Sequence, residues 1–201
     1  MAVFAKKFGI KEVADVGFYE VGTVSVDPST GTVTATKAPV LKFDTLKVST
    51  LEMTAEQSEA RGGKGNPPLI IWDYGREVNV TLEDALMSMD CLNAMFGDTT
   101  NDNTITINAN KFPGTYAVVG ITYARDIDGY DHLFTFYIPK AKIQSENTIT
   151  MEAEGDPTVF NMSLRVLRGN DNGDMVQFIL KENSKTDGTR EPIVLPTKSG
   201  T

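Results

Sequence analysis

The feature that most constrains this fold is the recurrence of short apolar runs, rich in valine and threonine and bounded by glycine, aspartate or asparagine. β-Branched side chains are stiff at χ1 and pack well on a pleated surface. Runs of this kind with turn residues between them are typical of antiparallel strands. The sequence therefore predicts a mainly β protein. Its 201 residues suit one domain, residues 1–201, whose core needs no disulfide or metal for stability.

Turn residues divide these runs into expected hairpins. Asp128-Gly129 is a strong two-residue hairpin signal, and Asp27–Gly31 and Gly169–Gly173 also have the composition of turns. The expected strands are Val16–Val26, Thr32–Thr36, Phe43–Met53, Leu69–Asp73, Glu77–Val80, Thr104–Asn108, Tyr116–Ala124, Leu133–Ile138, Asn147–Glu152, Thr158–Leu167 and Met175–Lys181. Leu69–Asp73 and Glu77–Val80 are expected to pair through a turn at Tyr74-Gly75.

One segment, Thr81–Phe96, has the pattern of a helix. Thr81 is placed as an N-cap with an acid three residues later, close to a capping box. Apolar residues then recur at a spacing of three or four, which makes one apolar face. Gly97 is placed to end the helix in the left-handed conformation. We expect the helix to pack on the sheets through a face made of Leu82, Leu86, Met89, Leu92 and Phe96.

Three segments do not have the pattern of core elements. They are an N-terminal arm at residues 1–14, a long polar loop at residues 54–68 and a C-terminal tail at residues 184–201. Loops as long as the second are uncommon in compact domains and are usually functional or disordered.

Composition narrows the classes of function. The net charge is −8 and the pI is about 4.7, so the chain gains little from counterion release and is not expected to hold nucleic acid tightly. One cysteine and one histidine exclude a disulfide framework and any multi-histidine metal site. No apolar run approaches a membrane span, and the N-terminus lacks a secretory signal. We expect a soluble, intracellular protein that is not an enzyme and holds no cofactor or metal.

Two loops suggest ligand sites but fit them poorly. Gly62–Asn66 is glycine-rich and contains Lys64, yet a phosphate-binding loop needs a serine or threonine after its lysine and a helix after that. Asp126, Asp128 and Asp131 surround Gly129, but the ligand order of a calcium loop is not met. A flexible loop and a solvated hairpin tip explain these two segments.

Single residues with reactive side chains have plain structural explanations. His132 is expected at a strand end, because a catalytic triad would need a nucleophile and an acid that one sequence cannot place beside it. Cys91 lies on the expected helix, where a partly buried thiol is expected. Trp72 is expected in the core or at a subunit contact.

The order of these elements resembles the major tail tube proteins of long-tailed bacteriophages. A polar strand, Phe43–Met53, leads into a loop that ends Gly-Gly-Lys-Gly-Asn-Pro-Pro. A strand pair, the helix Thr81–Phe96 and a set of β-hairpins follow, with extended termini at both ends. The resemblance covers about residues 15–182 and is carried mainly by the block Glu59–Gly97.

The resemblance implies an antiparallel β-sandwich with one flanking helix. Six copies would form a ring whose inner sheets join into one β-barrel, and stacked rings would make the tube that conducts DNA at infection. The same fold serves tailocins and type VI secretion tubes. The partners implied are further copies of the chain and other tail proteins, such as the tape measure, terminator and baseplate or distal tail proteins. The implied location is the virion tail, assembled in the host cytoplasm without a membrane.

Physical arguments agree with this resemblance. A ring of joined sheets removes edge strands that would otherwise aggregate. A polar strand such as Phe43–Met53 suits the wall of a water-filled channel, and an acidic wall would repel DNA phosphates. The loop is expected to contact a neighbouring subunit. Its candidate interface residues are Glu56, Glu59, Arg61, Lys64 and Asn66.

Two other classes of function remain open on the sequence. One is a β-sandwich binding module, such as a capsid-decoration or receptor-binding protein of a virion. The other is an enzyme on a β scaffold, which the scarcity of histidine and cysteine disfavours while a carboxylate-only hydrolase stays possible.

Overall fold

The computed structural model describes residues 7–10, 15–27, 30–86, 88–98, 104–145, 160–181 and 189–197. Its strands pair only in antiparallel fashion, and one helix flanks them, so the mainly β fold class is confirmed. Within these ranges the strands do not close a barrel. No helix there is long and apolar enough to cross a membrane.

The elements follow one another in a simple order along the chain. They are β1 (Phe8–Ile10), β2 (Asp15–Glu20), β3 (Val24–Asp27), β4 (Thr32–Ala35), β5 (Leu41–Phe43), β6 (Leu46–Arg61), β7 (Pro68–Asp84), α1 (Met89–Phe96), β8 (Thr115–Asp126), β9 (Asp131–Ile143), β10 (Phe160–Val166) and β11 (Gln177–Lys181).

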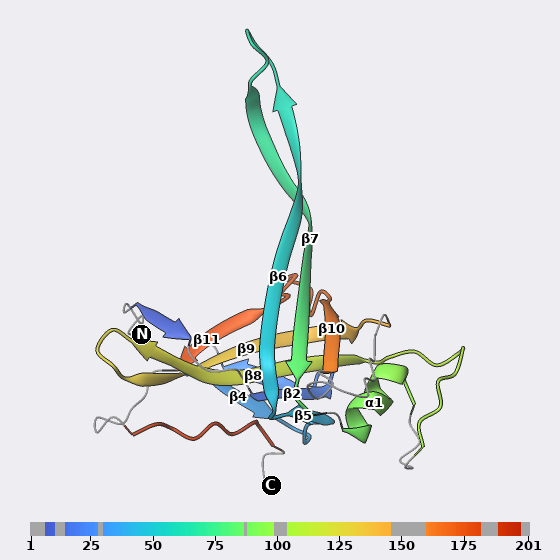
Figure 1. Ribbon diagram of the computed structural model, residues 1–201. Coiled ribbons are helices and arrows are strands. Elements are labelled where there is room, and N and C mark those ends of the chain that lie inside the picture. The colour runs from blue at the N-terminus through green and yellow to red at the C-terminus, as the bar shows by residue number, and fades with distance from the viewer. Residues whose placement is uncertain are drawn as a thin grey trace, which may run out of the picture.

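Strand β9 is where the main sheet divides into two layers. The sheet order is β5-β2-β8-β9-β10-β7-β6, with β1 added to β8 and β11 added to β9. The first part of β9, Leu133–Tyr137, pairs with β11, whereas its end, Ala141–Ile143, pairs with β10. The layer β10-β7-β6 therefore lies over β2-β8-β9, and Figure 1 shows β6 and β7 running across β8 and β9.

The main core fills the space between the two layers. Alternate residues of β7 and β10 point inward, as the two-residue period of a strand requires, and α1 closes one end through Cys91, Ala94 and Met95. The largest fully buried side chains of this core are Phe18, Phe43, Leu82, Met95, Ile138, Ile143, Met162 and Leu164.

A smaller core lies on the opposite face of β2-β8-β9. The hairpin β3-β4 covers part of it, and residues 189–197, here called the strap, cover the rest through the buried Leu195. The buried Tyr19 hydroxyl donates a hydrogen bond to the carbonyl of Pro196 at 2.9 Å, and burial raises the pKa of Tyr19 to about 12. The described part of the expected C-terminal tail is thus docked on the body.

The hairpin of β6 and β7 is much longer than the body that supports it. Its outer part, residues 54–77, projects away from the sandwich as a two-stranded ribbon, here called the arm (Figure 1). The expected loop at residues 54–68 is therefore wrong, because Thr54–Arg61 belongs to β6 and only residues 62–67 form a turn. Neither face of this strand is buried, so the alternation that marks a strand in sequence is missing.

The expected turn at Tyr74-Gly75 is also wrong, because β7 runs straight through it. The pairing register shifts between Thr54 and Glu56, and Gly75 adopts a φ of 62° at this bulge. The predicted pair Leu69–Asp73 and Glu77–Val80 is one strand, and its partner is β6.

The helix is shorter than expected. Thr81–Asp84 is the end of β7, and α1 begins after Ser88, whose hydroxyl accepts the backbone N–H of Cys91 at 3.2 Å. Val78, Val80 and Leu82 are buried at every second position, so the strand period prevails over the helical one. Gly97 ends the helix at a φ of 66°, as expected. The predicted contact of Leu86 is wrong, since this residue is 66% exposed.

Other boundaries differ from the expectation. Val16–Val26 and Phe43–Met53 are each interrupted by turns, and Thr104–Asn108 is not a strand. β10 and β11 do not pair with each other, since each pairs with a different part of β9. The hairpins of β3 with β4 and of β8 with β9 are confirmed, and β1 lies in the predicted N-terminal arm. The expected strand Asn147–Glu152 lies outside the described residues.

We predict that Leu82→Ala lowers the free energy of unfolding by about 2–5 kcal/mol, because this side chain is fully buried between the layers. The matched control is Leu86→Ala, which should change it by less than about 0.5 kcal/mol because the side chain is exposed. Urea unfolding followed by circular dichroism measures both. Equal losses in the two variants would contradict the placement of β7.

Candidate functional site

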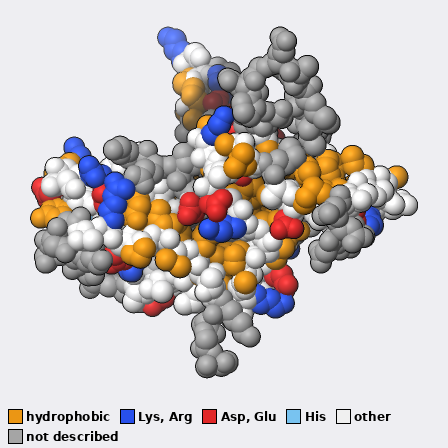
Figure 2. Space-filling model, turned by 60° about the horizontal axis from the view of Figure 1, so that its bottom comes forward, with side chains coloured by type: hydrophobic (Ala, Val, Ile, Leu, Met, Phe, Trp, Pro, Cys, Tyr) orange, Lys and Arg blue, Asp and Glu red, His pale blue; other side chains and the backbone are white. Residues whose placement is uncertain are grey.

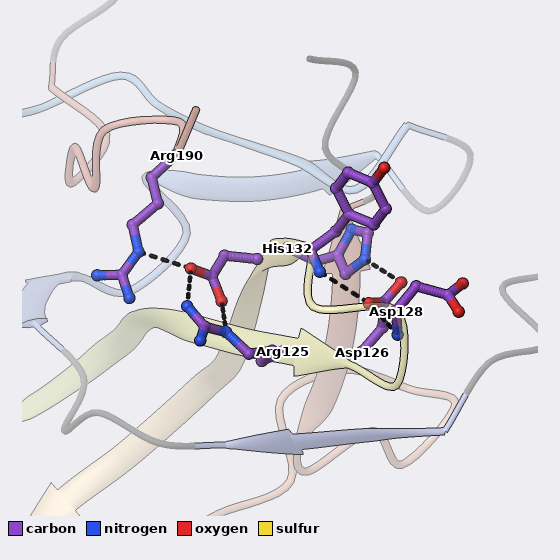
Figure 3. Close-up of polar contacts among 7 residues, drawn as sticks. Arg125, Asp126, Asp128, His132 and Arg190 are labelled. Carbon is purple, nitrogen blue, oxygen red and sulfur yellow. Dashed lines mark hydrogen bonds and ion pairs between the residues drawn. The ribbon is translucent and has the colours of Figure 1, made fainter. Parts of the chain in front are cut away.

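The sole histidine lies in a polar cluster at the turn between β8 and β9 (Figure 3). One carboxylate oxygen of Asp126 accepts the backbone N–H groups of Asp128 and Tyr130 at 3.0 and 2.9 Å. Its other oxygen lies 3.2 Å from Nε2 of His132, and both side chains are buried. These contacts hold the turn in place, so the buried pair of Asp126 and His132 has a structural role. Among the described residues no group of three or more histidine, cysteine, aspartate or glutamate side chains is placed to hold a metal.

A neighbouring cluster at Asp131 fastens the strap to the body. Arg125 contacts both carboxylate oxygens of Asp131 at 2.7 and 2.8 Å, and Arg190 of the strap reaches one of them at 2.6 Å (Figure 3). The guanidinium of Arg190 also lies 4.8 Å from the ring centre of Tyr123. The hydrogen bonds from Arg125 and Arg190 hold the pKa of Asp131 well below its usual value of 3.8, although its burial opposes them.

We predict that Asp131→Asn destabilises the protein at pH 7, because two guanidinium groups lose their carboxylate partner. The pKa of Asp131 is depressed in the folded protein, so its contribution is complete above about pH 4 and declines as the pH falls below this value. Urea unfolding from pH 7 to pH 3 should show the gap between wild type and variant narrowing below pH 4. A gap that widens there would contradict the assignment.

The glycine-rich segment and the cysteine, which also suggested a site, have structural roles. Gly62–Asn66 forms the turn at the tip of the arm and leads into a strand, so the helix that a phosphate-binding loop requires is not there. Cys91 lies on the buried side of α1, and burial raises the pKa of its thiol, which keeps it protonated.

The arm carries a stripe of exposed hydrophobic residues. Leu69, Ile70, Ile71, Trp72 and Tyr74 are each between 51% and 65% exposed. Paired residues of an antiparallel ribbon share a face, so Ile70 and Trp72 lie on the same face as their small partners Ala60 and Ser58. Large apolar side chains gathered on an exposed ribbon are typical of an interaction surface.

All five predicted interface residues lie on the arm or at its tip, and all are exposed. Arg61 pairs with Glu59 of its own chain at 2.6 Å, and Lys64 and Asn66 belong to the turn, with Asn66 at a φ of 51°. Glu56 lies opposite Tyr74. The sequence analysis missed the apolar stripe, because it ended the strand Leu69–Asp73 at a turn and expected Trp72 in the core or at a subunit contact. The core position is wrong, since Trp72 is 51% exposed. The continuous apolar run in an otherwise polar hairpin is the sequence feature that could have revealed the stripe.

The layer β10-β7-β6 presents a second candidate surface, its outer face, here called the polar face. Glu52, Asn79 and Arg165 form one row across the three strands, and Thr50, Thr81 and Ser163 form the next. Glu77 and Glu83 lie on the same face of β7, where Glu77 pairs with Arg165. The alternate residues of β7 and β10 point into the core, so one sheet separates a dry interior from a hydrated outer face.

The side of the body away from the arm is less distinctive. Figure 2 shows acidic and basic side chains interspersed there with hydrophobic ones. The described atoms of that side present no large surface of a single charge sign, so the arm and the polar face remain the candidate functional surfaces.

Comparison with known proteins identifies a family. The YomU/Tube protein family matches the chain over residues 8–100 and 92–178, which together reach from β1 into β11. A comparison with curated proteins finds no significant match. The family match points to a phage tube-like structural protein and agrees only coarsely with the tail tube resemblance. Because the match covers most of its length, the chain belongs to the YomU/Tube protein family.

Proposed function

We propose that the protein is a virion structural protein that assembles as hexameric rings stacked into a phage tail tube, the conduit for DNA ejection. The family match supports a tube-like structural role. The single observation that carries the finer proposal is the arm, a hairpin whose outer part makes no core with its own body. The proposed location is the tail of the virion, and the proposed function requires no membrane, cofactor or catalysis.

The arm is proposed to reach a neighbouring subunit in the same ring or the next one. An isolated two-stranded ribbon is marginal in water, so the stripe around Ile70 and Trp72 gains most from packing against another surface. The eight residues of Thr54–Arg61 extend over roughly 26 Å at the usual rise of a strand. Glu56, Lys64 and Asn66 would then lie at the contact, with Arg61 shared between Glu59 and acidic groups of the neighbour.

The polar face is proposed to line the channel. Among the strands that the structure describes, β6 is the last of its sheet, so its outer edge can pair with the sheet of a neighbouring copy. Joining six such sheets would close the barrel that the single chain leaves open. Glu52 of β6 and Glu77 and Glu83 of β7 place carboxylates along the β6–β7 part of this face, which suits a wall past which phosphates slide.

Tube assembly should bury Trp72, the only tryptophan, which makes it a reporter of the proposed contact. In the free subunit Trp72 is half exposed. We expect its fluorescence emission to move to shorter wavelength as the protein concentration is raised and rings or tubes form. Sedimentation velocity and negative-stain microscopy on the same samples detect the assemblies. An unchanged emission in well-formed tubes would contradict burial of the arm.

The stripe can be tested without removing the reporter. Ile70→Ser combined with Tyr74→Ser should leave the urea unfolding of the monomer almost unchanged, because both side chains are exposed, and should abolish tube formation. The matched control is Ile127→Ser, at a side chain that is 73% exposed at the turn after β8. A wild-type protein that stays monomeric at all concentrations would instead favour a β-sandwich binding module.

The proposed channel wall predicts weak retention of DNA. Tubes of the wild type should release labelled duplex DNA at physiological salt, because an acidic wall offers phosphates no counterion release. Thr81→Lys combined with Glu83→Lys places cations on the polar face and should make tubes retain DNA in a salt-dependent manner. Co-sedimentation of DNA with tubes measures this. Equal release of DNA by wild-type and variant tubes would show that the polar face does not line the channel.

A further inference from the structure

Four cations gather on one flank of the polar face, in a protein of net charge −8. This basic flank consists of Arg76 of β7, Lys142 of β9, Arg165 of β10 and Arg168, which follows the end of β10. Lys142 and Arg165 are direct cross-strand partners and share a face. Like charges in that position repel each other, so the flank favours an acidic group beside them.

Intramolecular contacts leave much of this charge uncompensated. Arg165 pairs with Glu77, whereas Arg168 donates to the backbone carbonyls of Asn170, at 2.9 Å, and Asp171. Carbonyl contacts orient a guanidinium without cancelling its charge. Within the described ranges, Arg76 and Lys142 have no ion-pair partner.

Two grooves open beside Arg165 and make the flank concave. One, of about 400 Å³, is lined by Lys142, Gln144, Arg165 and Leu167, at the point where β9 and β10 separate. The other, of about 390 Å³, lies at the base of the arm, and its lining includes Arg76, Arg165 and Arg168 together with one carboxylate, that of Glu77. A segment of chain that bears carboxylates can therefore lie between these cations.

The opposite flank of the same face is acidic and ends in an edge strand, which is paired on one side only among the described residues. β6 is the edge of its sheet, and Glu52 and Glu56 on it have no ion-pair partner in the described part of the chain. Glu52 stands in the same cross-strand row as Arg165, with Asn79 between them. The carboxylates at one edge and the cations at the other thus lie on one face.

We propose that the basic flank is the receiving site for the β6 edge of a second copy of this chain, with Glu52 and Glu56 of that copy bound among Arg76, Lys142 and Arg165. The inference rests on the proposed self-assembly and adds which surfaces meet. The contact is heterologous, because the edge and the flank are different surfaces, so it repeats head to tail and can close a ring. Attraction between the acidic edge and the basic flank then sets the direction of assembly. Two acidic edges repel each other, so edge-to-edge pairs are disfavoured.

A second copy matches these observations better than a nucleic acid does. A phosphate backbone would contact the cations but would also meet Glu52, Glu77 and Glu83 on the same face. The β6 edge of another copy carries its carboxylates on the face that also bears the cations, so joined sheets place the two sets side by side. It also satisfies the open backbone groups of an edge strand, which a nucleic acid cannot do by sheet pairing.

Two charge-reversed proteins test the contact. The flank variant is Arg76→Glu with Lys142→Glu, and the edge variant is Glu52→Lys with Glu56→Lys. Each alone should need roughly tenfold or more protein than the wild type to form rings in sedimentation velocity, because like charges meet at every contact. An equimolar mixture should restore rings, since each flank then meets an edge of opposite charge in an alternating hexamer.

Controls separate charge at this site from charge in general. Lys7→Glu with Lys42→Glu changes the net charge by the same amount as the flank variant, at residues that do not line the grooves, and should assemble as the wild type does. Urea unfolding confirms that each variant folds. If a reversal disturbs folding, the neutral pair Arg76→Gln with Lys142→Gln replaces it and should weaken assembly less.

The outcomes distinguish this inference from the proposed function. Failure of the wild type to assemble at any concentration would overturn both. Normal rings from either charge-reversed protein, or no recovery of rings in the mixture, would overturn the inference without contradicting the proposed assembly into a tube. A flank variant that assembles normally but loses binding of labelled duplex DNA at low salt would show that the flank receives phosphates, which also overturns it.

Discussion

The division of β9 between two partners is the constraint on which the rest of the structure depends. Its first part pairs with β11 and its last residues with β10, so one continuous sheet turns over on itself. This turn encloses the main core and gives the outer layer β10-β7-β6 a dry face and a wet face. Without it, Val78, Val80 and Leu82 would have no opposing layer to pack against.

The same arrangement leaves β6 and β7 only half supported. Near the body the inner face of β7 is buried and Leu46 and Leu51 of β6 are partly buried against the core, but beyond Gly75 the ribbon has solvent on both sides. An element of that kind is poorly stabilised by its own chain, because two strands bury little area. The apolar stripe and the charged edge are then exposed surfaces, and the family match points to a phage tube-like structural protein.

The fold class could be predicted because the local signals were consistent. β8 and β9, with buried alternating residues and Asp128-Gly129 between them, follow the sequence pattern closely. The arm could not be predicted from its sequence, since Thr54–Arg61 has no buried face and therefore no apolar period. The segment Thr81–Asp84 satisfies both a helical and a strand period, and only its pairing with β10 and β6 decides between them.

The candidate site, too, could be predicted from the sequence only in part. The five charged or polar residues expected at an interface are on the arm, because a polar, glycine-rich segment is an exposed one in either conformation. The apolar stripe, the polar face and the basic flank depend on register across strands distant in sequence, such as Arg165 opposite Lys142.

The sequence by itself determined the mainly antiparallel β class, the absence of multi-histidine and disulfide chemistry, and the hairpins of β3 with β4 and of β8 with β9. These follow from residue type and from periods of two to four residues, which act locally. Only the tertiary structure decided that residues 54–68 extend an arm, that the strap docks through Arg190 on Asp131, and that cations gather beside β10. Each of these depends on contacts between segments far apart in the chain, for which local sequence carries no signal.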